Sequence, residues 1–379
     1  PSRAMSLPLL DARKILVIVY GHMADTMAAI PALRSLDSAC PSASIEVLAL
    51  SSVRSVLEPC PHVDAFIGWS DFGRKGTRGS RIEKAARLAS LGLSLRRRHY
   101  DATLVFHRSS GAMRKLASLI ASPIRAGADV GGAGYTHPAP DGPSVGSSRD
   151  ENRRVLQGLG IEEDGGPVEL WTDPGDALWA RNLVGDVPGC RIGIHAGSDW
   201  SCQQWLPEKF AEVGRTLQSR LGAQIILTGS KSEVGLQEEV ASGLLSEPVR
   251  AAGATTFPQL VEVVRNLDLL ICVNSAAAAV ARAVGTPSVI LLGLEDSRYT
   301  GLEPGDLVRV IQPGAPPGEG GWCEFGRWGV LSGCNSPMCR GLGGLSALSP
   351  DEVVTAATAL LDGARSGEMS NPVHRTALA

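Results

Sequence analysis

The sequence predicts an α/β protein that contains two parallel sheets in tandem. Short apolar, β-branched runs alternate with segments of helical pattern along most of the 379 residues. Such alternation is typical of parallel sheets joined by right-handed crossovers. The alternation starts again after Pro188, and the chain is long enough for two domains of roughly 150 residues each. A hydrophobic content of 44% suits a packed globular protein.

Each half contains about five runs with the composition of strands. These runs are residues 14–20, 44–50, 63–69, 101–107 and 124–128, and then 191–195, 224–228, 249–252, 269–273 and 288–292. The helices predicted between and after them are residues 27–36, 74–98, 152–159, 210–221, 233–244, 257–266, 276–284 and 352–362. We expect an N-terminal Rossmann-like domain over residues 1–178 and a C-terminal one over 179–348, followed by a helix and a tail over 349–379.

Two segments of the first half have an unusual composition. Residues 74–98 are basic, and we interpret the arginines at their end as a solvated helix terminus. Residues 131–148 are rich in Gly, Pro and Ser and indicate a long loop, which in compact domains is often functional. Further on, Asp173-Pro174 is expected to open a connection between the two halves, and the tail from Gly363 is expected to lack fixed structure.

One strand-to-helix junction has the pattern of a phosphate site. The apolar run 269–273 leads into the Ala-rich helix 276–284, with Asn274 and Ser275 between them. A helix that begins where a strand ends presents bare backbone N–H groups, which attract phosphate. On this stretch alone, an ordinary βα turn that binds nothing is an equally open interpretation.

Composition and charge exclude several classes of protein. The net charge of −3 gives no bulk basic field for nucleic acid. No apolar run approaches the roughly 20 residues that cross a bilayer, and the charges within residues 9–20 fit a signal peptide poorly. Eight scattered cysteines indicate mostly reduced thiols. We therefore expect a cytoplasmic protein without a transmembrane segment, for which peripheral membrane contact stays open.

Four blocks of sequence carry a resemblance to a known family. They are residues 15–36 with Asp25 and Ile30-Pro31-Ala32-Leu33, residues 193–210 with Gly197, Trp200, Trp205, Pro207 and Phe210, then Leu227-Thr228-Gly229-Ser230, and residues 267–293 with Gly285-Thr286-Pro287. In this order the blocks resemble glycosyltransferase family 9, the heptosyltransferases of lipopolysaccharide synthesis. The resemblance implies a GT-B architecture, in which two Rossmann-like domains face a central cleft. It also implies that the N-terminal domain binds the acceptor, that the C-terminal domain binds the sugar nucleotide, and that the sugar carbon is inverted without a metal or other cofactor.

The donor-side blocks depart from the family pattern. The family usually has Lys followed by Arg and Trp where this chain has Gln203-Gln204-Trp205. It usually has Asp-Ser-Gly, with His three residues further on, where this chain has Asn274-Ser275-Ala276 and Ala279. We expect either a donor other than ADP-heptose, such as a GDP- or UDP-hexose, or impaired catalysis. A non-catalytic relative that binds sugar nucleotides is the alternative function, and an epimerase of sugar nucleotides is a weaker one.

Inverting transfer needs a base for the acceptor hydroxyl. Asp25 lies in the loop after the first predicted strand, and the resemblance implies that it is this base. From the residues alone, a helix cap is an equally open role for Asp25. His22, His107 and Arg108 also follow strands of the N-terminal half, and we assign them to contacts with the acceptor, a glycolipid or small molecule. Loop histidines with internal hydrogen bonds and a surface arginine are an equally open interpretation.

The leaving diphosphate needs hydrogen-bond donors if no metal is used. The candidates are Ser198, Gln203, Thr228, Gly229, Glu233, Asn274, Ser275 and Ala276, with Glu233 as a ribose contact. Each has an ordinary capping or surface role as its alternative. Trp200 and Trp205 are expected to pack rather than to stack on a ligand. Cys323, Cys334 and Cys339 fall one ligand short of a structural zinc site, so we expect no metal.

Overall fold

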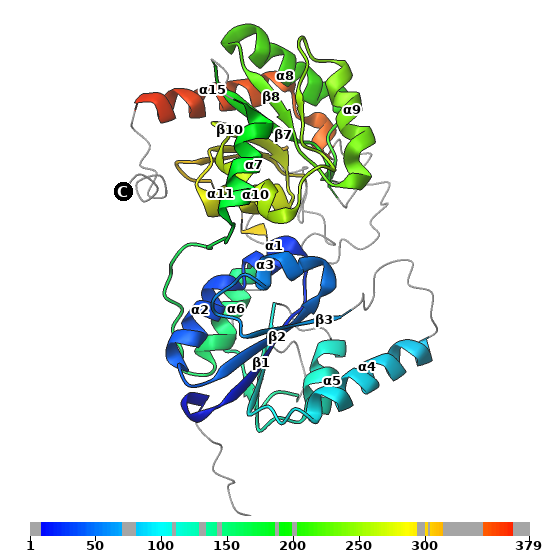
Figure 1. The fold of residues 1–379 in the computed structure, drawn as a ribbon, viewed down its shortest axis with the longest axis vertical. Helices are drawn as coiled ribbons and strands as arrows, with labels where there is room; N and C mark the ends of the chain where they lie inside the picture. Colours follow the sequence, from blue (N-terminus) through cyan, green and yellow to red (C-terminus); the bar gives the residue numbers. More distant parts are fainter. Residues whose placement is uncertain are drawn as a thin grey trace, which may run out of the picture. The chain divides into compact units, whose positions relative to one another are not determined.

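The computed structural model describes residues 9–69, 81–107, 111–128, 134–141, 146–185, 189–198, 203–293, 300–301, 304–313 and 344–366. The chain forms two compact units, Pro1–Glu169 and Leu170–Ala379. Each unit has its own sheet and its own hydrophobic core (Figure 1). The units divide before α7 (Pro174–Val184), whereas the sequence placed the domain boundary between residues 178 and 179, inside that helix.

The first unit contains a six-stranded parallel sheet with the order β3-β2-β1-β4-β5-β6. Its strands are β1 (Lys14–Val19), β2 (Ser44–Leu50), β3 (Ala65–Trp69), β4 (Ala102–Phe106), β5 (Ile124–Gly127) and β6 (His137–Pro138). Residues 15–19 of β1 are all buried, as expected for a central strand that is covered on both faces. The strand order reverses at β1, so β1 and β4 flank the topological switch point of this sheet.

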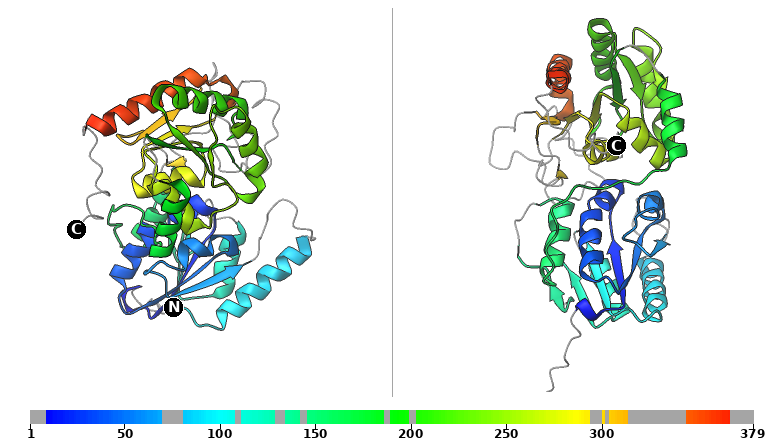
Figure 2. Two further views of the ribbon diagram at one scale, coloured as in Figure 1. Left: turned by 45° about the horizontal axis from the view of Figure 1, so that its top comes forward. Right: turned by 60° about the vertical axis from the view of Figure 1, so that its left-hand side comes forward.

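Helices cover both faces of this sheet (Figure 2). They are η1 (Leu9–Asp11), α1 (Met23–Met27), α2 (Ile30–Ala39), η2 (Ser51–Val53), α3 (Arg54–Leu57), α4 (Arg81–Arg96), α5 (Gly111–Ile120) and α6 (Ser148–Gln157). Helix α2 packs against α6, and α4 packs against α5 (Figure 1). Gly92 makes the second contact possible, because a Cβ atom there would lie 2.7 Å from Leu119 Cβ.

The second unit repeats the same strand pattern, with the order β12-β11-β10-β7-β8-β9. Its strands are β7 (Arg191–His195), β8 (Gln224–Leu227), β9 (Val249–Arg250), β10 (Leu269–Val273), β11 (Ser288–Leu291) and β12 (Val308–Ile311). Its helices are α7, α8 (Pro207–Leu221), η4 (Lys231–Glu233), α9 (Val234–Ser242), α10 (Phe257–Arg265), α11 (Ala276–Val284), η5 (Gly344–Ala347) and α15 (Pro350–Ser366). Here the order reverses between β7 and β10. No helix in the described ranges is long and apolar enough to cross a membrane.

The predicted α/β fold with two Rossmann-like sheets is confirmed, with several corrections. Each sheet has six strands among the described residues rather than about five, because the short β6 and the partly exposed β12 carry weak strand signals. Helix α1 occupies residues that were predicted to be a loop, and the helix predicted at residues 27–36 is α2, which begins at Ile30 and ends at Ala39. The connection expected after Asp173 is helix α7, whose N-terminus is capped where Asp173 accepts a hydrogen bond from Asp176 N at 2.9 Å.

The boundaries of two other segments also differ from the prediction. Helix α5 occupies a stretch to which the sequence assigned no element, and it buries Met113, Leu116, Ala117 and Ile120 along one face. Helix α15 continues to Ser366, past the point at Gly363 where a tail without fixed structure was expected. It packs on α8 and on strands of the second sheet, so this helix belongs to the core of the second unit.

In both sheets, an aspartate that precedes one strand accepts a backbone hydrogen bond from the start of the neighbouring strand. Asp101 precedes β4, and its carboxylate accepts hydrogen bonds from the backbone N–H groups of Arg13 and Lys14 at 2.8 and 3.0 Å. Asp268 precedes β10 and accepts from Arg191 N at 2.7 Å. Each carboxylate therefore pairs the first backbone donor of the neighbouring strand, which would otherwise lack a partner within the sheet.

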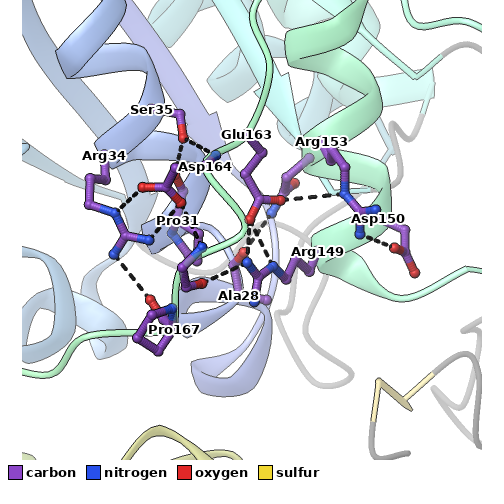
Figure 3. A network of polar contacts seen from close by, with 12 residues as sticks. Ala28, Pro31, Arg34, Ser35, Arg149, Asp150, Arg153, Glu163, Asp164 and Pro167 are labelled. Atoms are coloured by element: carbon purple, nitrogen blue, oxygen red, sulfur yellow. Dashed lines mark hydrogen bonds and ion pairs between the residues drawn. The ribbon is translucent and has the colours of Figure 1, made fainter. Parts of the chain in front are cut away.

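A charged clasp secures the chain segment that follows α6 (Figure 3). Arg34 on α2 donates to both carboxylate oxygens of Asp164, at 2.5 and 2.8 Å, and to Glu169 at 2.9 Å. Arg149 on α6 pairs with Glu163, whose side chain is only 2% exposed. The bidentate hydrogen bonds from Arg34 lower the pKa of Asp164 to about 2. The clasp therefore ties residues 163–169 to α2 and α6 before the chain enters the second unit.

This clasp predicts a pH-dependent contribution to stability. The pKa of Asp164 is lower when folded, so its contribution is complete above the ordinary Asp pKa of about 4 and is lost as pH falls toward 2. The side chain is 43% exposed, so we expect no more than about 1 kcal/mol. Asp164→Asn should lower Tm by about 2–4 °C at pH 7, and the gap to wild type should narrow below pH 4. Thermal unfolding that shows a constant gap down to pH 3 would contradict the assignment.

Candidate functional site

The switch point of the first sheet brings together three of the predicted site residues, His22, Asp25 and His107. Gly21 and His22 follow β1, and His107 follows β4, whose last residue pairs with the last residue of β1. Ligands of parallel α/β sheets bind at the carboxyl ends of strands on either side of such a point. Asp25 lies in the first turn of the short helix α1, not in a loop as the sequence suggested.

Hydrogen bonds hold both oxygens of the Asp25 carboxylate. Oδ2 accepts from His22 N at 3.0 Å, and Oδ1 accepts from the Ser148 hydroxyl at 2.6 Å. A Cβ atom at Gly21 would lie 2.4 Å from Asp25 Cβ, so only glycine leaves room for this conformation. The two roles considered for Asp25 therefore coexist, because one oxygen caps α1 while the side chain remains 27% exposed.

The surroundings of Asp25 keep its carboxylate ionised. Burial raises the pKa of Asp25, but His107, the Ser148 hydroxyl and the His22 amide lower it, and the net pKa lies below its ordinary value. His107 Nδ1 lies 3.9 Å from Asp25 Oδ1. An ionised carboxylate beside an imidazole is able to accept a proton from a hydroxyl group.

His107 has an uncommon backbone conformation. Its φ of +66° lies in the left-handed region, which favours glycine. Its backbone N–H donates to Asn152 Oδ1 at 2.6 Å, and Asn152 Nδ2 donates to Ala28 O at 3.2 Å. Within the described residues, His107 Nδ1 is buried without a hydrogen-bond partner. Arg108, the other predicted acceptor contact on this loop, lies outside the described residues.

The second sheet places a buried imidazole beside its own switch point. His195 is the last residue of β7 and pairs across the sheet with Cys272 of β10. Its Nδ1 atom lies 3.0 Å from the hydroxyl of Thr228, which is fully buried. Burial lowers the pKa of His195, and the negative charge of Glu233 opposes part of this effect. His195 is therefore neutral at physiological pH, and the hydrogen bond with Thr228 fixes the orientation of its ring.

Glu233 lies against two backbone segments that follow strands. Its Oε2 atom accepts from Ser230 N at 2.6 Å. A Cβ atom at Gly197, after β7, would lie 2.0 Å from Glu233 Oε1, and one at Gly229, after β8, would lie 3.3 Å from Oε2. The two glycines thus allow the carboxylate to lie directly on the loops at the carboxyl ends of β7 and β8. Gln237 on α9 is 2% exposed and lies beside Gly229, and neither of its amide atoms has a hydrogen-bond partner among the described residues.

The loop after β7 is held by side-chain hydrogen bonds. The Ser198 hydroxyl donates to Gln203 Oε1 at 2.9 Å, and Gln204 Nε2 donates to Ser198 O at 3.0 Å. Trp205 is 1% exposed, and its ring meets that of Phe210 edge to face at 4.9 Å. Trp205 thus packs in the core, as expected, while Trp200 lies outside the described residues.

Helix α11 begins without a side-chain cap. Asn274 and Ser275 follow β10, and Ala276 is the first helical residue. Ser275 has extended backbone angles, but its hydroxyl caps no N–H group and is buried without a partner in the described part of the chain. Within the described residues, no side chain caps the first N–H groups of α11, so these groups and the Ser275 hydroxyl could donate hydrogen bonds to an anion at the switch point between β7 and β10.

Comparison with known proteins identifies the class of enzyme to which the chain belongs. Residues 153–311 match the model of glycosyltransferase family 9 (heptosyltransferase). The chain is a glycosyltransferase, and over these residues its sequence is similar to that of family 9. Lipopolysaccharide heptosyltransferase 3 of Escherichia coli is 27% identical over 289 residues, which span 72% of this chain and 81% of that protein. The resemblance that the sequence indicated is confirmed.

Solved structures show that this chain has the GT-B fold. The glycosyl transferase family 9 structure from Veillonella parvula has a TM-score of 0.74 and 21% identity, and the match covers 95% of this chain and 99% of that one. The structure of ADP-heptose lps heptosyltransferase II of E. coli has a TM-score of 0.66 and 20% identity, and the match covers 93% of this chain and 99% of that one.

Sequence reasoning overlooked several residues at these sites. Ser148 begins α6 and Asn152 lies one turn later, both more than 120 positions after Asp25, and no local pattern connects them with it. The only signal was the long Gly- and Pro-rich loop that ends at Ser148. The predicted donor residues Ser198, Gln203, Thr228, Gly229, Glu233, Asn274, Ser275 and Ala276 all lie at or near the carboxyl ends of β7, β8 and β10. Cys323, Cys334 and Cys339 lie outside the described residues.

Gly197→Ala tests the placement of Glu233. The new methyl group would meet the end of a flexible side chain, so Glu233 should move at little cost in folding stability. If Glu233 contacts the ribose, its displacement should weaken nucleotide binding about tenfold. Gly235→Ala is the matched control, since a Cβ atom there meets nothing within 4 Å. Calorimetric titration of both variants is the measurement, and equal affinity in the two would remove Glu233 from the donor site.

Proposed function

We propose that this chain is an inverting, metal-independent glycosyltransferase that uses Asp25 as its base. The observation that supports this most directly is the carboxylate of Asp25, which is kept ionised and fixed by two hydrogen bonds at the switch point of the first sheet. The sugar would come from a nucleoside-diphosphate sugar bound by the second unit. The acceptor would be a hydroxyl group of a glycolipid or a small molecule.

The reaction would proceed by a single displacement. The acceptor oxygen attacks the anomeric carbon while its proton moves to Asp25, and the bond from that carbon to the diphosphate oxygen breaks. The nucleoside diphosphate leaves with the bonding electron pair. The uncapped N–H groups of α11 and the Ser275 hydroxyl are the donors we assign to the negative charge of the diphosphate.

Two classes of donor sugar fit this proposal. One structural neighbour is E. coli heptosyltransferase WaaC solved with ADP, and the curated relatives are heptosyltransferases, which favours ADP-heptose. Gln203, Asn274 and Ala279 stand where the family usually has a cation, a carboxylate and an imidazole. An amide gives weaker stabilisation of a diphosphate than a cation does. A GDP- or UDP-hexose is therefore the second donor class to test.

Asp25→Asn tests the assignment of the base. The amide keeps the shape of the side chain but cannot take up the proton, so we expect kcat to fall by about 10²–10⁴-fold. Nucleotide affinity should stay near that of wild type, because the donor residues belong to the other unit. Transfer assays with ADP-heptose and with hexose donors, together with a nucleotide titration, measure the two effects. Turnover near the wild-type rate would remove Asp25 from the role of base.

Calorimetric titration with ADP, GDP, UDP and dTDP tests the donor site. We expect one diphosphate to bind in the micromolar range, roughly −8 kcal/mol. Asn274→Ala should weaken that binding, since this residue immediately precedes the N-cap of α11. If none of the four binds, the Lys, Asp and His that Gln203, Asn274 and Ala279 replace are essential to nucleotide binding. The chain is then better described as a relative that binds no sugar nucleotide.

A further inference from the structure

Two adjacent serines at the start of α6 make different contacts. Ser147 is the N-cap, since its hydroxyl oxygen accepts from Asp150 N at 3.2 Å and its hydroxyl donates to Asp150 Oδ2 at 2.7 Å. Ser148 takes no part in this cap. Its hydroxyl instead donates to Asp25 Oδ1 at 2.6 Å, and the two residues are 123 positions apart in the sequence.

The contact from Ser148 fixes a degree of freedom that α1 leaves open. The His22 amide holds only Oδ2 of Asp25, and a carboxylate held at one oxygen still rotates about its Cβ–Cγ bond. A second donor at Oδ1 fixes the plane of the carboxylate. The backbone of Gly21 packs against the Asp25 side chain, which limits movement of the carboxylate away from its two donors.

A buried amide sets the position of α6 relative to Asp25. Asn152, one turn after Ser148, is 1% exposed. It donates to Ala28 O, directly after α1, and accepts from His107 N at the end of β4. One side chain thus joins three segments of the first unit, and it places the first turn of α6 within hydrogen-bond distance of Asp25.

We propose that Ser148 is a positioning residue of the transfer reaction, which orients the Asp25 carboxylate toward the acceptor hydroxyl. The proposal rests on Asp25 being the base, as proposed above. Ser148 itself lies outside residues 153–311, which match the family model. Its role is orientation rather than proton transfer, because its only described contact is with the carboxylate that does the chemistry. Small errors in the placement of a catalytic group lower the rate strongly.

Ser148→Ala tests the proposal, with Ser147→Ala as its matched control. Loss of the Ser148 hydroxyl should lower kcat about 10–100-fold and leave the KM for the donor within about twofold. Loss of the Ser147 cap should lower Tm by about 2–4 °C and leave kcat within about twofold. Ser148→Thr restores a hydroxyl at the same carbon and should recover part of the lost kcat. Steady-state kinetics and thermal unfolding of the three variants provide these values.

Three results would overturn the proposal. Ser148→Ala with wild-type kcat shows that the orientation of Asp25 does not depend on this hydroxyl. Equal losses of kcat in Ser147→Ala and Ser148→Ala show a general effect of α6 rather than a specific contact. An Asp25→Asn variant that turns over at the wild-type rate, assayed in parallel, removes the base itself. The first two results leave the base assignment standing, so the failure of the proposed function and the failure of this inference are distinguishable.

Discussion

One constraint shapes both halves of the molecule: all strands of a sheet run parallel, so the residues that follow them gather at a single edge. In each unit the strand order also reverses beside the first strand. The segments that follow the two strands at this point therefore lead away in opposite directions along the sheet. His22 and His107 follow such a pair of strands in the first unit, and Ala196 and Asn274 do so in the second. The strand order alone makes neighbours of residues that are far apart in the sequence, whatever side chains they carry.

The sequence was informative where this order depends on local patterns. Apolar runs located β2, β7 and β10 to the residue, and the Ala-rich run located α11. It was less informative where a contact decides the outcome. Helix α7 was overlooked although Asp173, Pro174 and Asp176 form a capping signature, because a Pro after a polar residue also suits a loop. Ser148 could not be predicted at all, since its importance comes from one long-range hydrogen bond and from no motif of its own.

The two units differ in how they treat charge. In the first, an ionised carboxylate is surrounded by an imidazole, a hydroxyl and a backbone amide that all favour its charged form. In the second, the described groups after β7 and β10 are mainly neutral: a buried imidazole, amides, hydroxyls and helix N–H groups. Neutral donors act on an anion only when they are held in place, because they lack the long-range attraction of a cation. The hydrogen bonds of Ser198 with Gln203 and of Thr228 with His195 supply that rigidity.

The left-handed backbone at His107 sets a limit on how stable this protein can become. A residue with a Cβ atom pays a conformational cost at a φ of +66° that glycine would avoid. Evolution toward stability alone would therefore favour glycine at this position and discard the imidazole that lies beside Asp25. Thermal selection of a mutant library, without an activity screen, would therefore enrich variants that lack the imidazole beside Asp25.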